Sequence, residues 1–142
     1  IEKGQEQGAK LIQGGQQVRK DSGGYFVEPT IFDNVKNDMI IAQEEIFGPV
    51  LSVLTFDELD EAIKIANDTH YGLAAAVWTR DINLAHRTSR ALRAGVVWVN
   101  CFDEGDMSTP FGGYKQSGSG RDKSIHALDK YVDLKMTWVK LY

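Results

Sequence analysis

An α/β fold, with a parallel sheet flanked by helices and an added C-terminal strand, is predicted by three features of this 142-residue sequence. Residues 49–56, 73–79 and 96–100 are short apolar runs of strand length. The two segments between these runs have the residue spacing of amphipathic helices. Because the strands are apolar on both faces and alternate with helices, we expect them to pair in parallel under helical cover.

The part of the chain before these elements is less regular. Residues 24–32, GYFVEPTIF, are rich in aromatic and β-branched residues and predict an extended segment that is interrupted at Pro29. The first fifteen residues are amphipathic at most and start at Ile1 without an initiator methionine. We therefore expect the chain to be a fragment, or to have been trimmed at its N-terminus.

Each of the two predicted helices begins after an aspartate. Asp57 and Asp81 stand at N-cap positions, where a carboxylate accepts hydrogen bonds from free backbone N–H groups. Gly95 is expected to end the second helix. Apolar or small residues recur on one face of each helix, at Leu59, Ala62, Ile63 and Ala66 in the first and at Leu84, Ala85, Thr88 and Leu92 in the second.

After residue 100 the alternation of strands and helices stops. Residues 102–121 hold five glycines and one proline, but also two phenylalanines and a tyrosine, and we predict an ordered, functional loop. A short helix is predicted over 122–130. Within residues 131–142 the apolar Val132, Leu134, Met136 and Trp138 alternate with Asp133, Lys135 and Thr137, which predicts a strand with one buried face. No partner for this strand is evident in the sequence.

Charge and composition narrow the possible functions. The net charge of −4 disfavours nucleic-acid binding, which requires a basic face. No apolar run approaches the roughly 20 residues that a membrane-spanning helix needs. A single cysteine, Cys101, excludes an internal disulfide and favours a reducing cytoplasm. The three histidines are scattered along the chain, so no zinc site is expected.

The glycine-rich stretch 112–123, GGYKQSGSGRDK, is a weak candidate for phosphate binding. It lacks the G-x-G-x-x-G spacing, because Lys123 stands where the third glycine is required. It also lacks the Gly-Lys-Ser/Thr end of a P-loop. We interpret these glycines as residues that permit tight turns close to a ligand.

Cys101 is a weak candidate for a nucleophile. It follows the last predicted strand, at the edge where α/β folds place their chemistry. A reactive thiol needs a base or a cation beside it. The nearest charged residues are instead Asp103, Glu104 and Asp106, which disfavour a thiolate. An unreactive cysteine is the simpler interpretation.

The stretch EEIFGPV, residues 44–50, places a carboxylate and an aromatic ring beside a Gly-Pro turn. A carboxylate can accept hydrogen bonds from both adjacent hydroxyls of a ribose. A phenyl ring two residues later could support the nicotinamide that such a ribose carries. From the residues alone, a solvated Glu45 beside a core Phe47 explains the stretch more simply.

Four segments together resemble the C-terminal part of the NAD(P)-dependent aldehyde dehydrogenases. They are QEEIFGPV (43–50), NDTHYGLAAAVWTRD (67–81), GVVWVN (95–100) and PFGGYKQSGSGR (110–121). The resemblance runs through essentially the whole chain in the same order. It implies that residues 1–121 belong to the catalytic domain and that 122–142 are a short helix and an oligomerisation strand, with 131–141 joining a homo-oligomer.

The resemblance also assigns roles to individual residues. It implies that Glu45 binds the ribose of NAD or NADP and that Phe47 packs against the nicotinamide. It further implies that Phe102, Asp103 and Phe111 line the tunnel for the aldehyde. The residues that would distinguish NAD from NADP have no counterpart here.

Other features of that family have no match in the sequence. No glycine-glutamine-x-cysteine stretch is present, so Cys101 does not correspond to the catalytic cysteine, and the general base is also missing. No residue of the chain is therefore assigned a catalytic role, and the chain alone is expected to be inactive. A CoA-acylating relative and a non-catalytic oligomerisation module are the alternatives.

The segment 100–124, NCFDEGDMSTPFGGYKQSGSGRDKS, is similar to the branch of the family that acts on γ-glutamyl-aminobutyraldehyde and related aminoaldehydes. Three carboxylates, Asp103, Glu104 and Asp106, would attract a cationic substrate to the mouth of the tunnel. An amine- or polyamine-derived aldehyde is therefore the predicted substrate. A solvated acidic loop without a binding role explains the same residues equally well.

Overall fold

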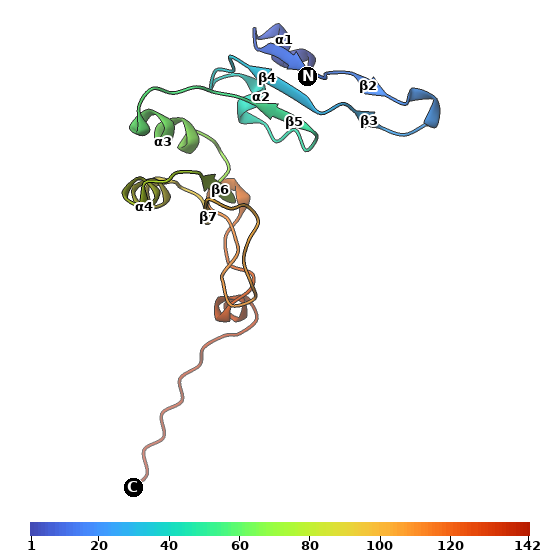
Figure 1. The fold of residues 1–142 in the computed structure, drawn as a ribbon. Coiled ribbons are helices and arrows are strands. Elements are labelled where there is room, and N and C mark those ends of the chain that lie inside the picture. Colours follow the sequence, from blue (N-terminus) through green and yellow to red (C-terminus); the bar gives the residue numbers. More distant parts are fainter. The chain divides into compact units, whose positions relative to one another are not determined.

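The computed structural model describes all residues from Ile1 to Tyr142, which form two compact units, Ile1–Thr69 and His70–Tyr142. The first unit contains α1 (Glu2–Glu6), β1 (Lys10–Gln13), β2 (Gln17–Val18), the 3-10 helix η1 (Lys20–Ser22), β3 (Phe26–Val27), β4 (Thr30–Asp33), α2 (Ile40–Gln43), β5 (Val50–Ser52) and α3 (Leu59–Asn67) (Figure 1).

The first unit is built on a three-stranded sheet in the order β1-β4-β5. The central strand β4 runs antiparallel to β1 and parallel to β5, with Thr30 opposite Val50 and Phe32 opposite Ser52. Strands β2 and β3 pair as a separate antiparallel ribbon that extends away from this sheet (Figure 1). The predicted extended segment is confirmed, since β3 and β4 lie on either side of Pro29.

The core of the first unit surrounds β4. Phe32 is fully buried and packs in one cluster with four other buried side chains. The buried Thr30 hydroxyl donates a hydrogen bond to the Glu28 carbonyl and accepts one from the Gly15 amide, both at 2.8 Å. This pairing removes the cost of burying the hydroxyl. The other members of the core cluster are Ala9, Val35, Met39 and Ile41.

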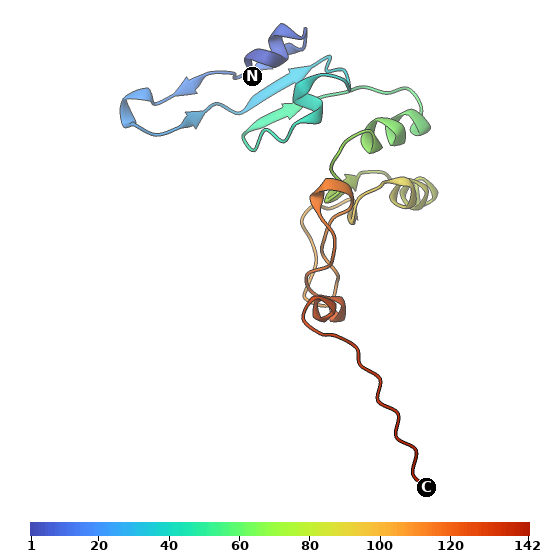
Figure 2. The same ribbon diagram turned by 180° about the vertical axis from the view of Figure 1, so that it is seen from behind.

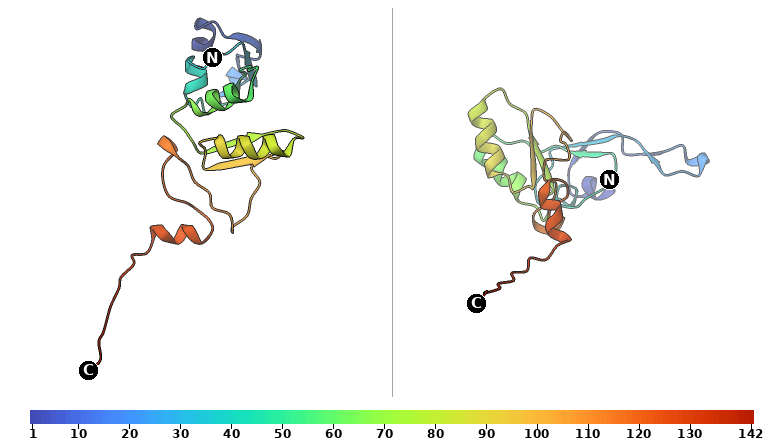
Figure 3. Two further views of the ribbon diagram at one scale, coloured as in Figure 1. Left: turned by 90° about the vertical axis from the view of Figure 1, so that its left-hand side faces the viewer. Right: turned by 90° about the horizontal axis from the view of Figure 1, so that it is seen from below.

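The second unit contains a strand-helix-strand unit. Strand β6 (Ala74–Val77) and strand β7 (Val96–Val99) are parallel and in register, from Ala74 opposite Val96 to Val77 opposite Val99. Helix α4 (Ile82–Ala91) connects them and lies along the pair (Figure 3). The predicted N-cap at Asp81 is confirmed, because its carboxylate accepts hydrogen bonds from the Asn83 and Leu84 amides. Two 3-10 helices follow, η2 (Lys115–Ser117) and η3 (Ile125–Lys130).

The parallel pairing of the strands is confirmed, but their grouping is corrected. Residues 49–56 contain only the short strand β5, which pairs with β4 and not with β6. The three predicted strands therefore lie in two sheets. The strand is shorter than predicted: its regular register with β4 ends with Ser52 opposite Phe32, and just beyond this pair Asn34 adopts a left-handed φ of 55°, which is not a strand conformation.

The ends of the two long helices also differ from the prediction. Helix α3 begins at Leu59 and has no side-chain cap; the Asp57 amide instead donates to the Glu61 carboxylate at 3.0 Å. A carboxylate in the first helical turn therefore accepts from a backbone amide before the helix, whereas an N-cap side chain before the helix would accept from amides of the first turn. Helix α4 ends at Ala91, several residues before Gly95, so Gly95 does not terminate it.

The C-terminal end of the chain departs most from the prediction. The helix expected over 122–130 is the 3-10 helix η3, which begins at Ile125 under a cap from the Ser124 hydroxyl. The strand expected over 131–142 does not form, and Leu134 is 100% exposed. Figures 1 and 2 show these residues, in red, as an extended tail. A strand requires a partner for its backbone groups, and a single copy of the chain offers none.

The boundary between the two compact units lies between Thr69 and His70. The boundary predicted at residue 121 separates the catalytic part of the chain from the oligomerisation part, which is a functional division, and it stays a prediction. The helices are all too short or too polar to cross a membrane.

Candidate functional site

The EEIFGPV stretch forms the turn between α2 and β5. Helix α2 ends at Gln43, and the Glu44 amide donates to the Ile40 carbonyl at 2.8 Å to close the last turn. At the other end, the Pro49 carbonyl accepts a hydrogen bond from the Thr30 amide at 2.8 Å. The turn is therefore anchored at both ends by the core sheet of the first unit.

Both predicted cofactor residues project from this turn into solvent. Glu45 is exposed, and the Phe47 side chain is 93% exposed. The interpretation of Phe47 as a core residue is therefore wrong. Phe47 also has a φ of 53°, a left-handed conformation that is uncommon for a bulky residue. Such strain is found where the surrounding structure enforces it, and it concentrates at functional sites.

The arrangement makes Glu45 and Phe47 available to a ligand. An exposed carboxylate and an exposed ring, two residues apart on an anchored turn, can meet the hydroxyls and the flat ring of one nucleotide. A fully exposed phenylalanine gains nothing from folding, because its apolar surface stays in water. Their role in cofactor binding stays a prediction.

In the second unit, the carboxyl ends of β6 and β7 are joined by the side chain of Asn100. Its Oδ1 accepts a hydrogen bond from the Thr79 amide at 2.8 Å, and its Nδ2 donates to the Thr79 carbonyl at 2.9 Å. Asn100 has a left-handed φ of 56°, which turns the chain out of β7 and into the loop beginning at Cys101. In parallel α/β sheets this edge is where ligands bind.

The loop and β7 enclose a cleft of about 240 Å³. Two of the three predicted substrate residues, Asp103 and Phe111, line this cleft. Phe102 does not line it, but packs against the cleft residue Trp98 with 5.1 Å between ring centroids. The Trp98 indole N–H donates to the Glu104 carbonyl at 2.7 Å and so ties the loop to the strand.

The prediction of an ordered loop is confirmed by its hydrogen bonds. The Phe111 and Asp122 backbones exchange two of them, at 2.7 and 2.6 Å. The Asp106 carboxylate accepts from both the hydroxyl and the amide of Ser108, and these bonds hold the pKa of Asp106 below its ordinary value. The loop is thus pinned at several points along its length.

Sequence reasoning missed two cleft residues, Trp98 and Lys123. Trp98 could have been singled out from the sequence, because it lies near the end of a predicted strand that leads into an acidic loop. Lys123 was noted only for breaking a glycine pattern, because nothing in the local sequence shows that it lies over Phe111. No group of three or more His, Cys, Asp or Glu side chains is placed to hold a metal ion.

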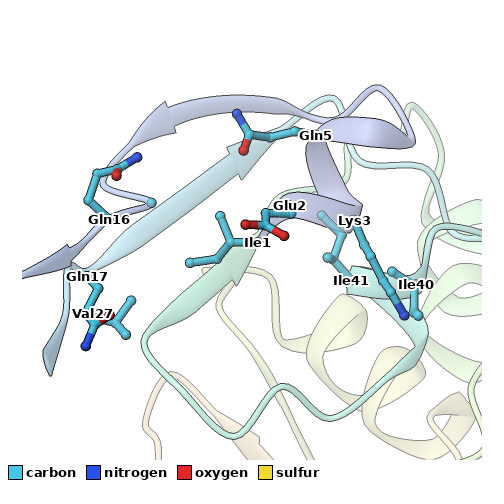
Figure 4. Close-up of a pocket in the computed structure, with 10 residues that line it drawn as sticks. Ile1, Glu2, Lys3, Gln5, Gln16, Gln17, Val27, Ile40 and Ile41 are labelled. Atoms are coloured by element: carbon cyan, nitrogen blue, oxygen red, sulfur yellow. The ribbon is translucent and has the colours of Figure 1, made fainter. Parts of the chain in front are cut away.

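A larger pocket, of about 600 Å³, lies beside α1 in the first unit. Figure 4 shows Glu2, Lys3, Gln5 and Gln16 around it, with the apolar side chains of Ile40 and Ile41 on one side. It contains none of the residues that the sequence singled out. Its mixed lining provides no group of residues with a recognisable chemistry.

Comparison with known proteins identifies the class of protein. The sequence model of the aldehyde dehydrogenase family matches residues 1–137. The aminoacetaldehyde dehydrogenase of Pseudomonas aeruginosa is 59% identical over 117 residues, which are 82% of this chain and 24% of that protein. The chain spans about a quarter of the length of the curated relatives that it matches.

Two solved structures extend this likeness to the fold. The P. syringae indole-3-acetaldehyde dehydrogenase AldA, in complex with NAD+ and IAA, is 67% identical with a TM-score of 0.96, over 99% of this chain and 28% of that one. The γ-glutamyl-γ-aminobutyraldehyde dehydrogenase of Burkholderia cenocepacia is 64% identical with a TM-score of 0.89, over 94% and 27%. The chain is a member of the aldehyde dehydrogenase family.

Proposed function

We propose that this chain is the C-terminal part of an enzyme that oxidises an aldehyde to the carboxylic acid with NAD+ or NADP+. The family match over residues 1–137 carries this proposal. Related proteins are described as aldehyde dehydrogenases, several of their structures contain NAD+, and one relative is described as NADP/NAD-dependent. The catalytic thiol and base of such an enzyme would be supplied from outside these 142 residues.

Within that enzyme, Glu45 binds the ribose next to the nicotinamide, and Phe47 supports the nicotinamide ring. The exposure of both side chains on one anchored turn supports these roles. Asp103 and Phe111 form part of the aldehyde site, and Phe102 supports it through Trp98. An ionised carboxylate beside an aromatic wall suits a substrate with a short carbon chain and a cationic end.

The substrate we propose is an amine- or polyamine-derived aldehyde. Asp103 and Glu104 both line the cleft, as does Phe111, so two acidic residues and an aromatic one belong to the same lining. Relatives described as aminoacetaldehyde and γ-glutamyl-γ-aminobutyraldehyde dehydrogenases support this class. The 67% identity to AldA favours a second candidate, an aromatic aldehyde of the indole type, for which Trp98 and Phe111 would provide apolar contact.

In the full-length enzyme, 4-aminobutanal is expected to have a kcat/KM about tenfold higher than hexanal, because the ammonium group is attracted to Asp103 and Glu104. NADH formation at 340 nm would measure both, with indole-3-acetaldehyde as a third substrate. Equal values for 4-aminobutanal and hexanal would contradict the aminoaldehyde assignment. A clear preference for indole-3-acetaldehyde would select the second candidate, and absence of NAD(P)+ reduction with every aldehyde would contradict the proposed function itself.

We further propose that the enzyme is a homo-oligomer joined through residues 131–141. The apolar side chains on one face of this segment are all exposed in the single chain, at Val132, Leu134, Met136 and Trp138. A strand with unpaired backbone groups and an apolar face is a template for pairing with another chain. A second copy of the chain would complete both the strand and its buried face.

Leu134→Lys is expected to weaken the oligomer, because it places a charge on the face that a partner would cover. Thr137→Lys is the matched control, since the same charge lies on the opposite face of an alternating strand and should leave assembly intact. Light scattering of the full-length enzyme would report the mass of each variant. An unchanged mass for Leu134→Lys, or equal dissociation of both variants, would be inconsistent with this interface.

A cytoplasmic location fits the single half-buried free thiol and the absence of any disulfide. Relatives described as mitochondrial also occur. Both compartments maintain conditions in which Cys101 would stay reduced.

A further inference from the structure

Lys123 is the one cation among the residues that line the 240 Å³ cleft of the second unit. Its ammonium nitrogen lies 5.6 Å from the centre of the Phe111 ring, over the face of that ring. A cation in this position is attracted to the aromatic face and keeps its remaining donors available. The side chain is exposed, yet it lies against the Phe111 ring, which is itself part of the cleft lining.

The backbone around Lys123 is held in an unusual conformation. Lys123 and Ser124 have φ values of 60° and 52°, two consecutive non-glycine residues in the left-handed region. The residue before them, Asp122, is paired with Phe111 through two backbone hydrogen bonds. The residue after Lys123 is also tied down, because the Ser124 amide donates to the Met107 carbonyl at 2.7 Å.

The strained backbone bears on where the Lys123 side chain lies. Strained backbone persists only where other contacts enforce it, and here the contacts fasten residues 122–124 to the loop that forms the cleft. The ammonium group is thereby carried to the Phe111 wall by an ordered stretch of chain.

The charges of the cleft are mixed. Asp103 and Glu104 supply two carboxylates, and Lys123 supplies one ammonium group. Lys123 also helps to hold the pKa of the neighbouring Asp106 below its ordinary value, after the larger effect of the Ser108 hydrogen bonds. A substrate with only an ammonium group is attracted by the two carboxylates, but the like charge of Lys123 weakens that attraction.

We propose that Lys123 is a specificity-determining residue that binds a carboxylate on the distal part of the substrate. The preferred aldehyde then carries both an ammonium group and a carboxylate, as the free end of an amino acid does. This inference rests on the proposed aldehyde dehydrogenase function and narrows its substrate class. Lys123 supplies a charge-assisted hydrogen bond to the carboxylate, while Asp103 and Glu104 accept from the ammonium group.

The test uses the full-length enzyme and four aldehydes that differ in charge: butanal, 4-aminobutanal, succinic semialdehyde and γ-glutamyl-4-aminobutanal. Lys123→Met is expected to lower kcat/KM about fivefold for the two substrates that carry a carboxylate, mainly through a higher KM. Butanal should be unaffected, and 4-aminobutanal should be used as well as before or better. Lys123→Arg should retain the wild-type preference because it retains the charge.

Lys64→Met is the matched control, since it removes one exposed lysine from α3 and changes the net charge by the same amount. Its four kcat/KM values should equal those of the wild type. A loss that is equal for all four aldehydes in Lys123→Met would show a purely structural lysine and overturn the proposal, as would four unchanged values. A wild-type enzyme that oxidises none of the aldehydes would instead contradict the proposed function.

Discussion

Glu45→Gln in the full-length enzyme is expected to lower turnover by about tenfold or more, equivalent to roughly 1.4 kcal/mol of transition-state stabilisation. An amide oxygen is a weaker acceptor than a carboxylate and can no longer accept two charge-assisted hydrogen bonds from a ribose. The nicotinamide would then be held less firmly at the reacting carbon. Turnover would suffer even at saturating cofactor, because placement of the ring is lost as well as affinity.

The neighbouring residue offers a matched control for this prediction. Glu44 is also exposed, but it is the C-cap residue of α2, in an extended conformation at the start of the turn. Glu44→Gln removes the same charge one residue away and should leave kcat within about twofold of the wild type. Steady-state kinetics with saturating NAD+, together with the KM for NAD+, would measure both variants. Wild-type kinetics in Glu45→Gln, or equal losses in both, would be inconsistent with a ribose-binding role for Glu45.

Gly95→Ala is expected to destabilise the second unit by about 3 kcal/mol or more. A Cβ atom on Gly95 would lie 1.8 Å from the carbonyl oxygen of Gly112 and 2.8 Å from its carbon. Both are backbone atoms, so the clash cannot be relieved by rotating a side chain. It can be relieved only by moving β7 or the loop that forms the cleft.

The hydrogen bonds around Gly95 explain why neither segment can move freely. The Gly72 carbonyl accepts hydrogen bonds from the amides of both Gly95 and Tyr114, at 2.9 and 2.8 Å. The segments before β6 and β7 therefore meet the loop at one carbonyl oxygen. Moving any of them to admit a methyl group would break buried backbone hydrogen bonds.

Gly23→Ala is the control for this substitution. Gly23 has a left-handed φ of 72°, and a Cβ there would meet no atom within 4 Å. Only the conformational cost remains, roughly 1–2 kcal/mol. Thermal unfolding of the full-length enzyme would compare the two variants. The packing argument fails if Gly95→Ala melts at the same temperature as Gly23→Ala or above it.

Short-range chemistry explains which sequence predictions succeeded. Asp81 caps α4 as predicted, because an N-cap depends only on the two or three residues that follow it. Strands β6 and β7 are parallel as predicted, since a helix between two apolar strands allows few other arrangements. Asp103 and Phe111, which the family resemblance assigns to the aldehyde tunnel, line one cleft although eight positions separate them, and their role there stays a prediction.

The tertiary structure decided what depends on distant partners. The length of β5 follows from its register with β4, and the exposure of Phe47 follows from anchors at Ile40 and Thr30. The position of Lys123 over Phe111 depends on backbone pairing between 111 and 122, which no local pattern records. The alternation at 132–138 predicts an apolar face, and the single chain leaves these residues exposed because a strand cannot pair with itself. The sequence alone determined the family resemblance, the capped helix α4 and the composition of the sites, because these depend on residue identity and close spacing. The grouping of the sheets, the close approach at Gly95 and the mixed charge of the cleft came only from the fold, because hydrogen bonds and steric contacts act between atoms that meet in space wherever they stand in the chain.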